Sequence, residues 1–325
     1  MPTPGPDTRL VAEIGLAIYP DCQLSAIYGL ADIFRIASDF AAPRAVRVTK
    51  WQADADGAVA CIDDTHPTAG PPRPGHLILP PSLIMPASMA DMRGLAGWLS
   101  ARHSQGVTLC SVCAGAFVLA ETGLLEGRAA TTHWVFADEF ARRFPGIRVE
   151  TGRMVIDEGD IITAGGILAW TDLGLTLVER LLGPSIMLDT ARFLLVDPPG
   201  RAQTPYSRFV PRLDHGDAAV LKVQHWLQKT GAKDHAVPAL AARAGLEERT
   251  FLRRFRKATG LRPTEYAQQV RIAKARAALE TTSRPVEQIG FEAGYGDPSA
   301  FRKLFHRVTG LSPADYRRRF GLAAA

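Results

Sequence analysis

The chain has little cysteine, no long apolar run and no basic N-terminal segment, and each absence excludes a class of protein. Its 325 residues include only four cysteines: Cys22, Cys61, Cys110 and Cys113. So few cysteines exclude a disulfide framework and favour a reducing cytoplasm. No stretch approaches the roughly 18 consecutive apolar residues that a membrane helix needs. The N-terminal residues MPTPGPDTRL lack a secretory signal, so we expect a cytoplasmic protein.

The net charge of +5 conceals two halves of opposite sign. Residues 1–200 hold 15 Lys and Arg against 22 Asp and Glu, a net of −7, whereas residues 201–325 hold 23 against 11, a net of +12. A basic segment joined to an acidic one indicates a polyanionic partner for one half only. Charge alone leaves a solvated basic surface as the alternative to nucleic-acid binding.

The acidic half alternates between apolar strand-like runs and helical patterns. This alternation is typical of a parallel sheet covered by helices on both faces. Strand signals stop after the Pro-rich segment 198–211, and the remainder is helical. We therefore expect a domain at 9–184, a linker at 185–213 with a helix near 185–195, and an all-α domain at 214–322. The expected strands are Leu10–Tyr19, Val46–Ala53, His76–Leu79, Val107–Val112, Met154–Ile156 and Ile161–Ala164, and the expected helices are Leu24–Ala37, Met92–His103, Ala116–Thr122 and Ile167–Leu182.

The basic half contains an internal repeat. The segment from Phe251, FLRRFRKATGLRPTEY, matches the segment from Phe301, FRKLFHRVTGLSPADY, with seven identities in sixteen positions at an offset of fifty. In each copy a short helix ends at a glycine, Gly245 or Gly294, where a C-terminal cap needs positive φ. A turn and a second helix follow, so each copy has the helix-turn-helix outline. The two units are expected at about 237–260 and 285–310.

The second helix of each copy has an apolar face and a basic face. Two phenylalanines in each helix lie on one face at 100° per residue, so we predict that they are core. The guanidinium of an arginine on the opposite face can donate two hydrogen bonds to the edge of a guanine. The candidate DNA-contacting residues are Arg249, Thr250, Arg253, Arg256, Ser299, Arg302, Lys303 and His306, with Arg271 and Lys274 on the connecting helix, and Arg254, Lys257 and Arg307, expected at phosphates.

The second copy resembles the signature of the AraC/XylS-type transcription regulators. The resemblance rests on the residues PVEQIGFEAGY from Pro285, followed by Phe301, Phe305, TGLSP from Thr309, and Tyr316. It covers about 105 residues and implies two helix-turn-helix subdomains joined by one long helix, here 263–280. The two recognition helices would enter adjacent major-groove segments about one helical turn apart.

The acidic half contains a strand, a sharp turn and a helix around Cys113. Val107–Val112 runs directly into Cys113-Ala114-Gly115, the arrangement of a nucleophile elbow. A thiol at a helix N-terminus is expected to have a lowered pKa, which favours thiolate. His133 follows twenty residues later and could complete a Cys/His pair. Cys110 lies inside the apolar strand, so we expect it to be buried and inert.

The segment SVCAGAFVLAETGLLEGRAATTHW, Ser111 to Trp134, closely resembles the class I glutamine-amidotransferase-like family in its intracellular-protease branch. The resemblance extends over residues 10–182 and implies a flavodoxin-like fold. Joined to an AraC-type domain, it resembles the GlxA-type regulators. Two departures argue against catalysis: Ala26 stands where the family's enzymes have a glutamate, and Pro81 has no N–H to offer an oxyanion, although Ser82 could still donate.

These observations predict a sequence-specific DNA-binding transcription regulator that is controlled by a small-molecule effector and is not an enzyme. The predicted effector pocket consists of Cys113, Ala114, Gly115, His133, Ala26 and Ser82. A thiol-based redox regulator and a DNA-tethered cysteine amidase or peptidase remain as alternatives, as does a purely structural or dimerising first domain. We expect duplex DNA, RNA polymerase and a second copy of the chain as partners, with no metal, no cofactor and no membrane.

Overall fold

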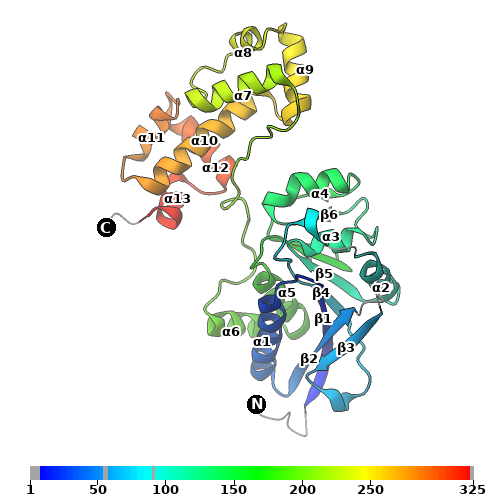
Figure 1. The fold of residues 1–325 in the computed structure, drawn as a ribbon. Helices are drawn as coiled ribbons and strands as arrows, with labels where there is room; N and C mark the ends of the chain where they lie inside the picture. Colours follow the sequence, from blue (N-terminus) through cyan, green and yellow to red (C-terminus); the bar gives the residue numbers. More distant parts are fainter. Residues whose placement is uncertain (1–7, 54–57, 90–91, 323–325) are drawn as a thin grey trace. The chain divides into compact units, whose positions relative to one another are not determined.

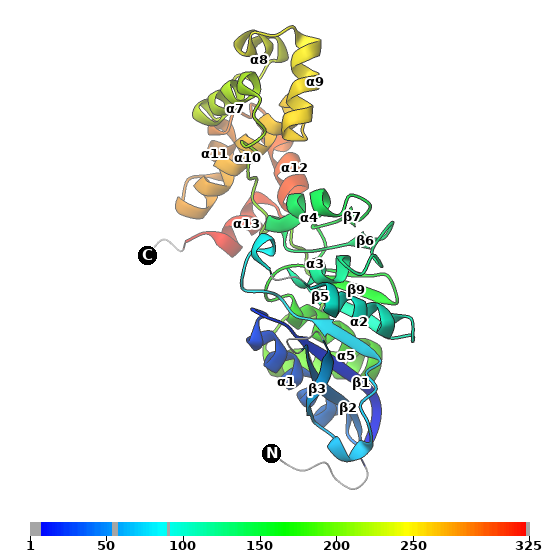
Figure 2. The same ribbon diagram turned by 45° about the vertical axis from the view of Figure 1, so that its right-hand side comes forward.

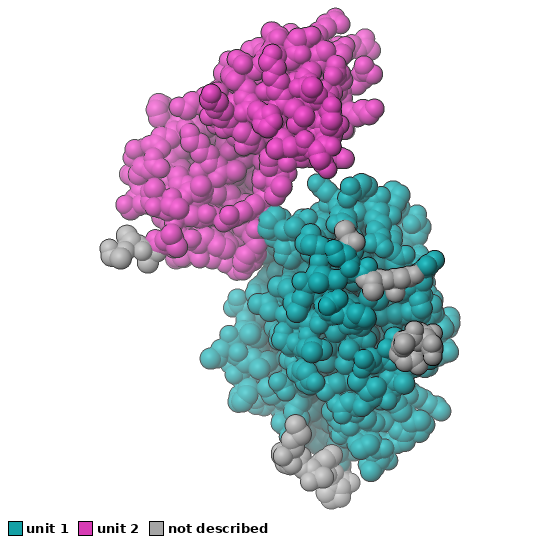
Figure 3. Space-filling model, viewed as in Figure 1, with its two compact units in different colours: residues 1–203 teal, residues 204–325 magenta. Residues whose placement is uncertain are grey.

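The computed structural model describes residues 8–53, 58–89 and 92–322, which separate into two compact units. Unit 1 comprises residues 1–203 and unit 2 comprises residues 204–325, coloured teal and magenta in Figure 3. Helix α6 (Pro184–Leu194) lies in the segment predicted as linker, close to the helix expected there. It contacts α5 (Trp170–Leu182) and α1 (Leu24–Ala41), so this part of the linker is packed against unit 1.

Unit 1 is built on a seven-stranded sheet whose order is β3-β2-β1-β4-β5-β9-β8. The five central strands run parallel, and the edge strands β3 and β8 pair antiparallel with their neighbours. The flavodoxin-like parallel sheet predicted from the sequence is therefore confirmed. The strands are β1 (Arg9–Ile18), β2 (Arg44–Ala53), β3 (Val59–Asp64), β4 (His76–Leu79), β5 (Thr108–Val112), β8 (Val155–Asp157) and β9 (Ile161–Ala164), with β6 (Ala129–Ala130) and β7 (Arg148–Val149) in a separate pair.

Helices cover both faces of this sheet (Figures 1 and 2). On one face, α1, α5 and α6 bury a core that includes Phe34 and Leu173. On the other, α2 (Arg93–His103), α3 (Gly115–Ala120) and α4 (Ala137–Arg143) bury a second core around Phe117 and Phe140. The central strands are apolar along their length because both of their faces are covered.

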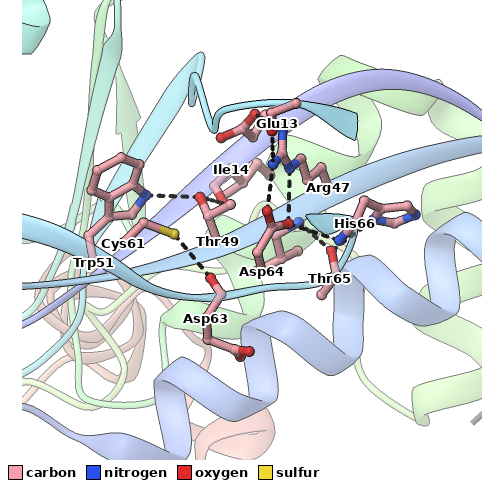
Figure 4. Close-up of polar contacts among 12 residues, drawn as sticks. Glu13, Ile14, Arg47, Thr49, Trp51, Cys61, Asp63, Asp64, Thr65 and His66 are labelled. Carbon is pink, nitrogen blue, oxygen red and sulfur yellow. Dashed lines mark hydrogen bonds and ion pairs between the residues drawn. The ribbon is translucent and has the colours of Figure 1, made fainter. Parts of the chain in front are cut away.

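The β1–β2–β3 side of the sheet contains a buried ion cluster around Arg47, which is 4% exposed (Figure 4). Its guanidinium donates to both carboxylate oxygens of Asp64, at 3.0 and 2.5 Å, and to Glu13 at 3.2 Å. The guanidinium lowers the pKa of the Asp64 carboxyl below its usual value. The ion pairs of Arg47 in β2 with Asp64 in β3 tie this edge strand to the sheet, because a buried charge is tolerated only when it is paired.

Unit 2 contains only helices among its described residues, and it has two separate cores. The first core includes Phe251, Phe255 and Tyr266, and the second includes Phe301, Phe305 and Tyr316. The long helix α10 contributes to both. The helices are α7 (Ala218–Thr230), α8 (Val237–Ala244), α9 (Glu248–Thr259), α10 (Pro263–Thr281), α11 (Val286–Glu292), α12 (Pro298–Thr309) and α13 (Pro313–Phe320).

The glycines expected to end the repeat helices have the predicted conformation. Gly245 follows α8 with φ +67° and Gly294 follows the end of α11 with φ +91°, values that favour glycine. Among the described residues, no helix is long and apolar enough to cross a bilayer. The same residues include no group of three or more His, Cys, Asp or Glu side chains suited to a metal ion.

Candidate nucleic-acid interface and effector site

The second helix of each repeat presents its basic side chains on the surface. Phe251 and Phe255 of α9, and Phe301 and Phe305 of α12, are at most 1% exposed, as predicted from their spacing. Their burial turns the opposite side of each helix outward. All of the following side chains are exposed: Arg249, Arg253, Arg256 and Lys257 on α9, and Ser299, Arg302, Lys303, His306 and Arg307 on α12.

The α9 face carries arginines that remain available to a ligand. Within the described residues, Arg249, Arg253 and Arg256 form no ion pair. Thr250, also predicted to contact DNA, is half-buried beside them. Three guanidinium groups on one helix face match the donor geometry that reads guanine edges and phosphate oxygens.

The α12 face is chemically different from the α9 face. Its one arginine among the predicted base-reading residues, Arg302, is ion-paired with Glu287 of α11, and both side chains are 55% exposed. Ser299 lies in the first turn of α12, next to the N-cap Asp297, whose carboxylate accepts its backbone N–H at 2.8 Å. Lys303 and His306 complete the exposed set. The exposed faces of α9 and α12 thus differ in charge.

Two arginines predicted at phosphates have structural partners instead. Arg271 of α10 is 7% exposed, and it donates to the carbonyl oxygens of Ala232 at 2.9 Å and Lys233 at 3.0 Å. Its prediction as a DNA contact is wrong, because α10 is enclosed by both cores and this side chain holds the α7–α8 connection. Arg254 donates to both carboxylate oxygens of Asp217, the N-cap of α7, at 2.9 and 2.7 Å. Lys274 is exposed and remains a predicted phosphate contact.

The nucleophile elbow predicted at Cys113 has the expected backbone. Cys113 follows β5 with φ +55°, a left-handed conformation that is uncommon for a residue other than glycine. Helix α3 begins two residues later at Gly115, where a Cβ would lie 2.7 Å from the carbonyl oxygens of Leu79 and Pro80. Only glycine permits this close approach between the helix start and the end of β4.

The chemistry predicted for the Cys113 thiol is not found. Cys113 is 2% exposed, and burial raises its pKa to about 12, although the backbone N–H of Ala114 partly opposes the shift. The expected thiolate is therefore wrong: desolvation outweighs the helix N-terminus, and the thiol stays protonated near neutral pH. Cys110 is fully buried with a pKa also raised to about 12, consistent with the inert role predicted for it.

The other predicted pocket residues do not surround an accessible thiol. Ala26 is fully buried, Ser82 is 5% exposed, and the Ser82 hydroxyl donates to the Asp21 carbonyl at 3.3 Å. His133 is half-buried, and its Nδ1 accepts the backbone N–H of Val135 at 3.1 Å. No hydrogen bond joins Cys113 to His133, both of which the structure describes. The predicted Cys/His pair is therefore absent from this conformation.

A pocket of about 380 Å³ lies against α3 instead, and its lining includes two residues of that helix. Phe117 and Val118 of α3 provide apolar surface, whereas Glu121 and Arg143 form an ion pair at its wall. The guanidinium of Arg143 also lies 5.9 Å from the centre of the Phe117 ring. The volume of this pocket is within the range of small-molecule sites. The full lining is Met89, Met92, Arg93, Phe117, Val118, Glu121 and Arg143.

The last residues of unit 1 form a latch, defined here as residues 201–203, which binds beside the elbow. Gln203 is 2% exposed, and its amide nitrogen lies within 3.0–3.1 Å of three acceptors: the Thr131 hydroxyl and the carbonyl oxygens of Thr132 and Arg153. The Thr132 hydroxyl in turn donates to the Cys113 carbonyl at 2.8 Å. Arg201 donates to the buried carboxylate of Asp172 at 3.0 and 2.5 Å. Sequence reasoning gave Gln203 no role.

The residues that follow are bound inside unit 2 by Arg276 of α10. The Arg276 guanidinium donates to the carbonyl oxygen of Pro205 at 2.6 Å and to that of Ser207. It also donates to the Tyr316 hydroxyl at 2.9 Å, which donates to Glu280 at 2.6 Å. The connection between the units is therefore hydrogen-bonded on both sides of Thr204.

Comparisons with known proteins match both units. Residues 43–180 match the DJ-1/PfpI family, and residues 240–319 match a helix-turn-helix domain. The chain is 31% identical to the HTH-type transcriptional regulator CdhR of Pseudomonas aeruginosa over 69% of this chain and 66% of that protein. It is 27% identical to the HTH-type transcriptional regulator GlxA of Rhizobium meliloti over 73% of each chain. The crystal structure of Drosophila melanogaster DJ-1beta is 18% identical, covers 57% of this chain and 98% of that one, and gives a TM-score of 0.44.

Proposed function

Because the chain belongs to the HTH-type transcriptional regulators that join a DJ-1/PfpI domain to an AraC-type domain, we propose that it regulates transcription in response to a small molecule bound by unit 1. The observation that carries the DNA-binding part is the pair of exposed basic faces on α9 and α12. The two faces differ, so the expected operator is an asymmetric pair of half-sites about one helical turn apart. Such a protein acts in the cytoplasm, where bacterial DNA lies.

Binding to the DNA upstream of its own operon tests this function. We expect specific gel shifts whose affinity falls steeply with salt, because bound lysines and arginines release counterions from the phosphates. A scrambled duplex of the same length is the control for non-specific binding. Absence of sequence-specific binding at every salt concentration would overturn the proposal.

The pocket against α3 is the site that we propose for the effector, in place of the closed ring around Cys113. In a reporter strain, growth conditions that change promoter output identify the response. Arg143→Ala removes a wall of the pocket and should abolish the response, while Arg142→Ala, an exposed neighbour on α4 that does not line the pocket, should retain it. Equal responses in both variants would place the effector elsewhere.

We propose that the latch couples the effector site to unit 2. Gln203 contacts the 131–132 segment, which holds the Cys113 carbonyl just before the pocket-lining helix α3. On the other side of Thr204, Pro205 is held by Arg276. Displacing Gln203 must strain or move Pro205, because two peptide units span only about 7 Å. A ligand that favours one latch position would thus shift the population of DNA-binding states.

The latch can be tested without a known effector. If it couples the two units, DNA bound at unit 2 must affect unit 1, because thermodynamic coupling between sites is reciprocal. In hydrogen exchange on the full chain, we expect operator DNA to change protection of residues 129–133, and Gln203→Met to remove that change. Gln105→Met, at an exposed position, is the matched control. A DNA-dependent change that persists in Gln203→Met would exclude this route.

The enzyme and redox alternatives both require a reactive Cys113. Because its pKa is raised to about 12, we expect native Cys113 to react with a thiol-directed probe at pH 8 roughly a thousandfold more slowly than an ordinary cysteine. Cys61 is half-buried and its pKa is raised by burial, so as an internal comparison it should itself react more slowly than an ordinary cysteine. Fast labelling of Cys113 near pH 6, abolished by His133→Ala, would revive the amidase or peptidase. Oxidant-dependent DNA binding that Cys113→Ser abolishes would revive the redox regulator.

We also propose that the protein works as a homodimer and contacts RNA polymerase, as the family resemblance implies. Sedimentation of the full chain at micromolar concentration measures its assembly. Polymerase recruitment to operator DNA, with and without the protein, measures the second contact. A monomer at every concentration, on and off DNA, would contradict the dimer.

A further inference from the structure

The exposed face of α9 contains one large apolar side chain among its arginines. Leu252 is 39% exposed, whereas its neighbour Phe251 is fully buried in the first core of unit 2. At 100° per residue, Leu252 lies 40° from Arg256 and 60° from Arg249 around the helix axis. It also lies 60° from the buried Phe255, so it stands at the edge of the arginine face, where its exposure leaves it open to a ligand.

The second copy of the repeat differs at this position. The residue fifty places on is Arg302, whose guanidinium is ion-paired with Glu287 of α11. The residue aligned with Glu287 in the first copy is Pro238, since the second turn has one extra residue. An ion pair in the second copy is thus replaced by two apolar residues in the first, which leaves the α9 face without a charge at this point.

The base edges of the major groove limit what such a leucine can contact. The C5-methyl group of thymine is the apolar group that they present, whereas guanine presents the acceptors that arginine recognises. On the premise of the proposed function, we infer that Leu252 is a specificity residue that packs against a thymine methyl in the half-site read by α9. The first half-site then combines guanines, read by the arginines, with a thymine beside them.

Deleting single methyl groups from the DNA tests this assignment. The full chain first selects its preferred duplex from a random pool, and each thymine is then replaced in turn by deoxyuridine, which keeps the base-pairing groups and loses the methyl. The wild type should lose about three- to fivefold in affinity at one thymine, as expected for one buried methyl. Leu252→Ala should bind the thymine and uracil duplexes equally at that position.

Leu213→Ala is the matched control, since Leu213 is 41% exposed in unit 2 and lies outside both recognition helices. It should keep the full uracil penalty. The inference is overturned if no uracil substitution weakens the wild type, if the selected half-site has no thymine, or if Leu252→Ala keeps the penalty. Failure of the proposed function would look different, because no duplex would then be selected above background.

Discussion

The two helix-turn-helix copies share one scaffold but present different chemistry to a ligand. Each buries two phenylalanines of its recognition helix and one tyrosine of the following helix, and each ends its recognition helix at a glycine with positive φ. Outside this framework, the α9 face carries arginines that form no ion pair with any described residue, together with one leucine. The α12 face carries lysine, histidine and an ion-paired arginine. The positions that fold the unit are thus separate from the positions proposed to read DNA.

Removing a core phenylalanine should have the largest effect and show whether the two copies fold independently. Phe255→Ala and Phe305→Ala each empty a fully buried position and should cost about 3–5 kcal/mol of unfolding free energy. Hydrogen exchange should show lost protection over α8–α9 in the first variant and over α11–α12 in the second. Equal loss across both copies in either variant would mean that α10 makes them one cooperative unit.

Replacing one basic residue on each face by alanine should distinguish contacts to base edges from contacts to phosphates. Arg253→Ala should cost about 1–3 kcal/mol of DNA-binding energy and relax the preference at one base position. Arg307→Ala, at an exposed α12 position predicted to contact a phosphate, should weaken binding to all sequences alike and lower the salt slope by about one charge. Competition between selected and scrambled duplexes measures both. A relaxed preference in Arg307→Ala alone would mean that Arg307 contacts a base and Arg253 a phosphate.

Removing the carboxylate beside Arg302 should have a smaller effect of opposite sign. Glu287→Gln releases Arg302, so we expect DNA affinity to rise by a small factor with little change in stability, because the ion pair is exposed. Salt titration of binding measures the change, and Glu287→Gln combined with Arg302→Ala is the control. A fall in affinity would show that Glu287 orients Arg302 for contact.

The smallest expected effect concerns an ion pair that only the first copy has. Arg254 holds the pKa of Asp217 below its usual value, whereas the matching position in the second copy is the buried Leu304. A lowered native pKa adds stability above the unfolded value of about 4 and loses it as pH falls through the native value. Asp217→Asn, which retains an N-cap, should therefore reduce the loss of stability below pH 4. An unchanged acid titration would contradict this.

Much of the fold could be predicted because local pattern and tertiary packing agree. The limits of α12, Pro298–Thr309, follow from an N-terminal proline and a final glycine, and those of β5 from an apolar run. Strand β3 was not predicted, since as an edge strand it is mostly accessible, with Ile62 54% exposed. The seven-residue helix α4 was missed because its pattern is too short to be periodic.

The candidate site was less predictable, because its decisive contacts join residues far apart in the chain. Arg271 was assigned to DNA from its helix alone, whereas its partners lie 36–39 residues away in a loop. Gln203 gives no local signal, since its acceptors Thr131 and Thr132 are 71–72 residues distant. The raised pKa of Cys113 likewise reflects burial that the elbow motif does not encode.

The hydrogen bonds on either side of Thr204 determine where this regulator can be recombined with others. A chimera that exchanges unit 2 at the prolines 198–199 would discard Arg201 and Gln203, and with them the contacts to Asp172 and Thr131. An exchange after Ser207 would instead replace Arg276 and leave behind the carbonyl oxygens of Pro205 and Ser207 that it binds. The bond between residues 203 and 204 is thus the junction at which another DNA-binding unit can be joined to unit 1 with both sets of contacts retained.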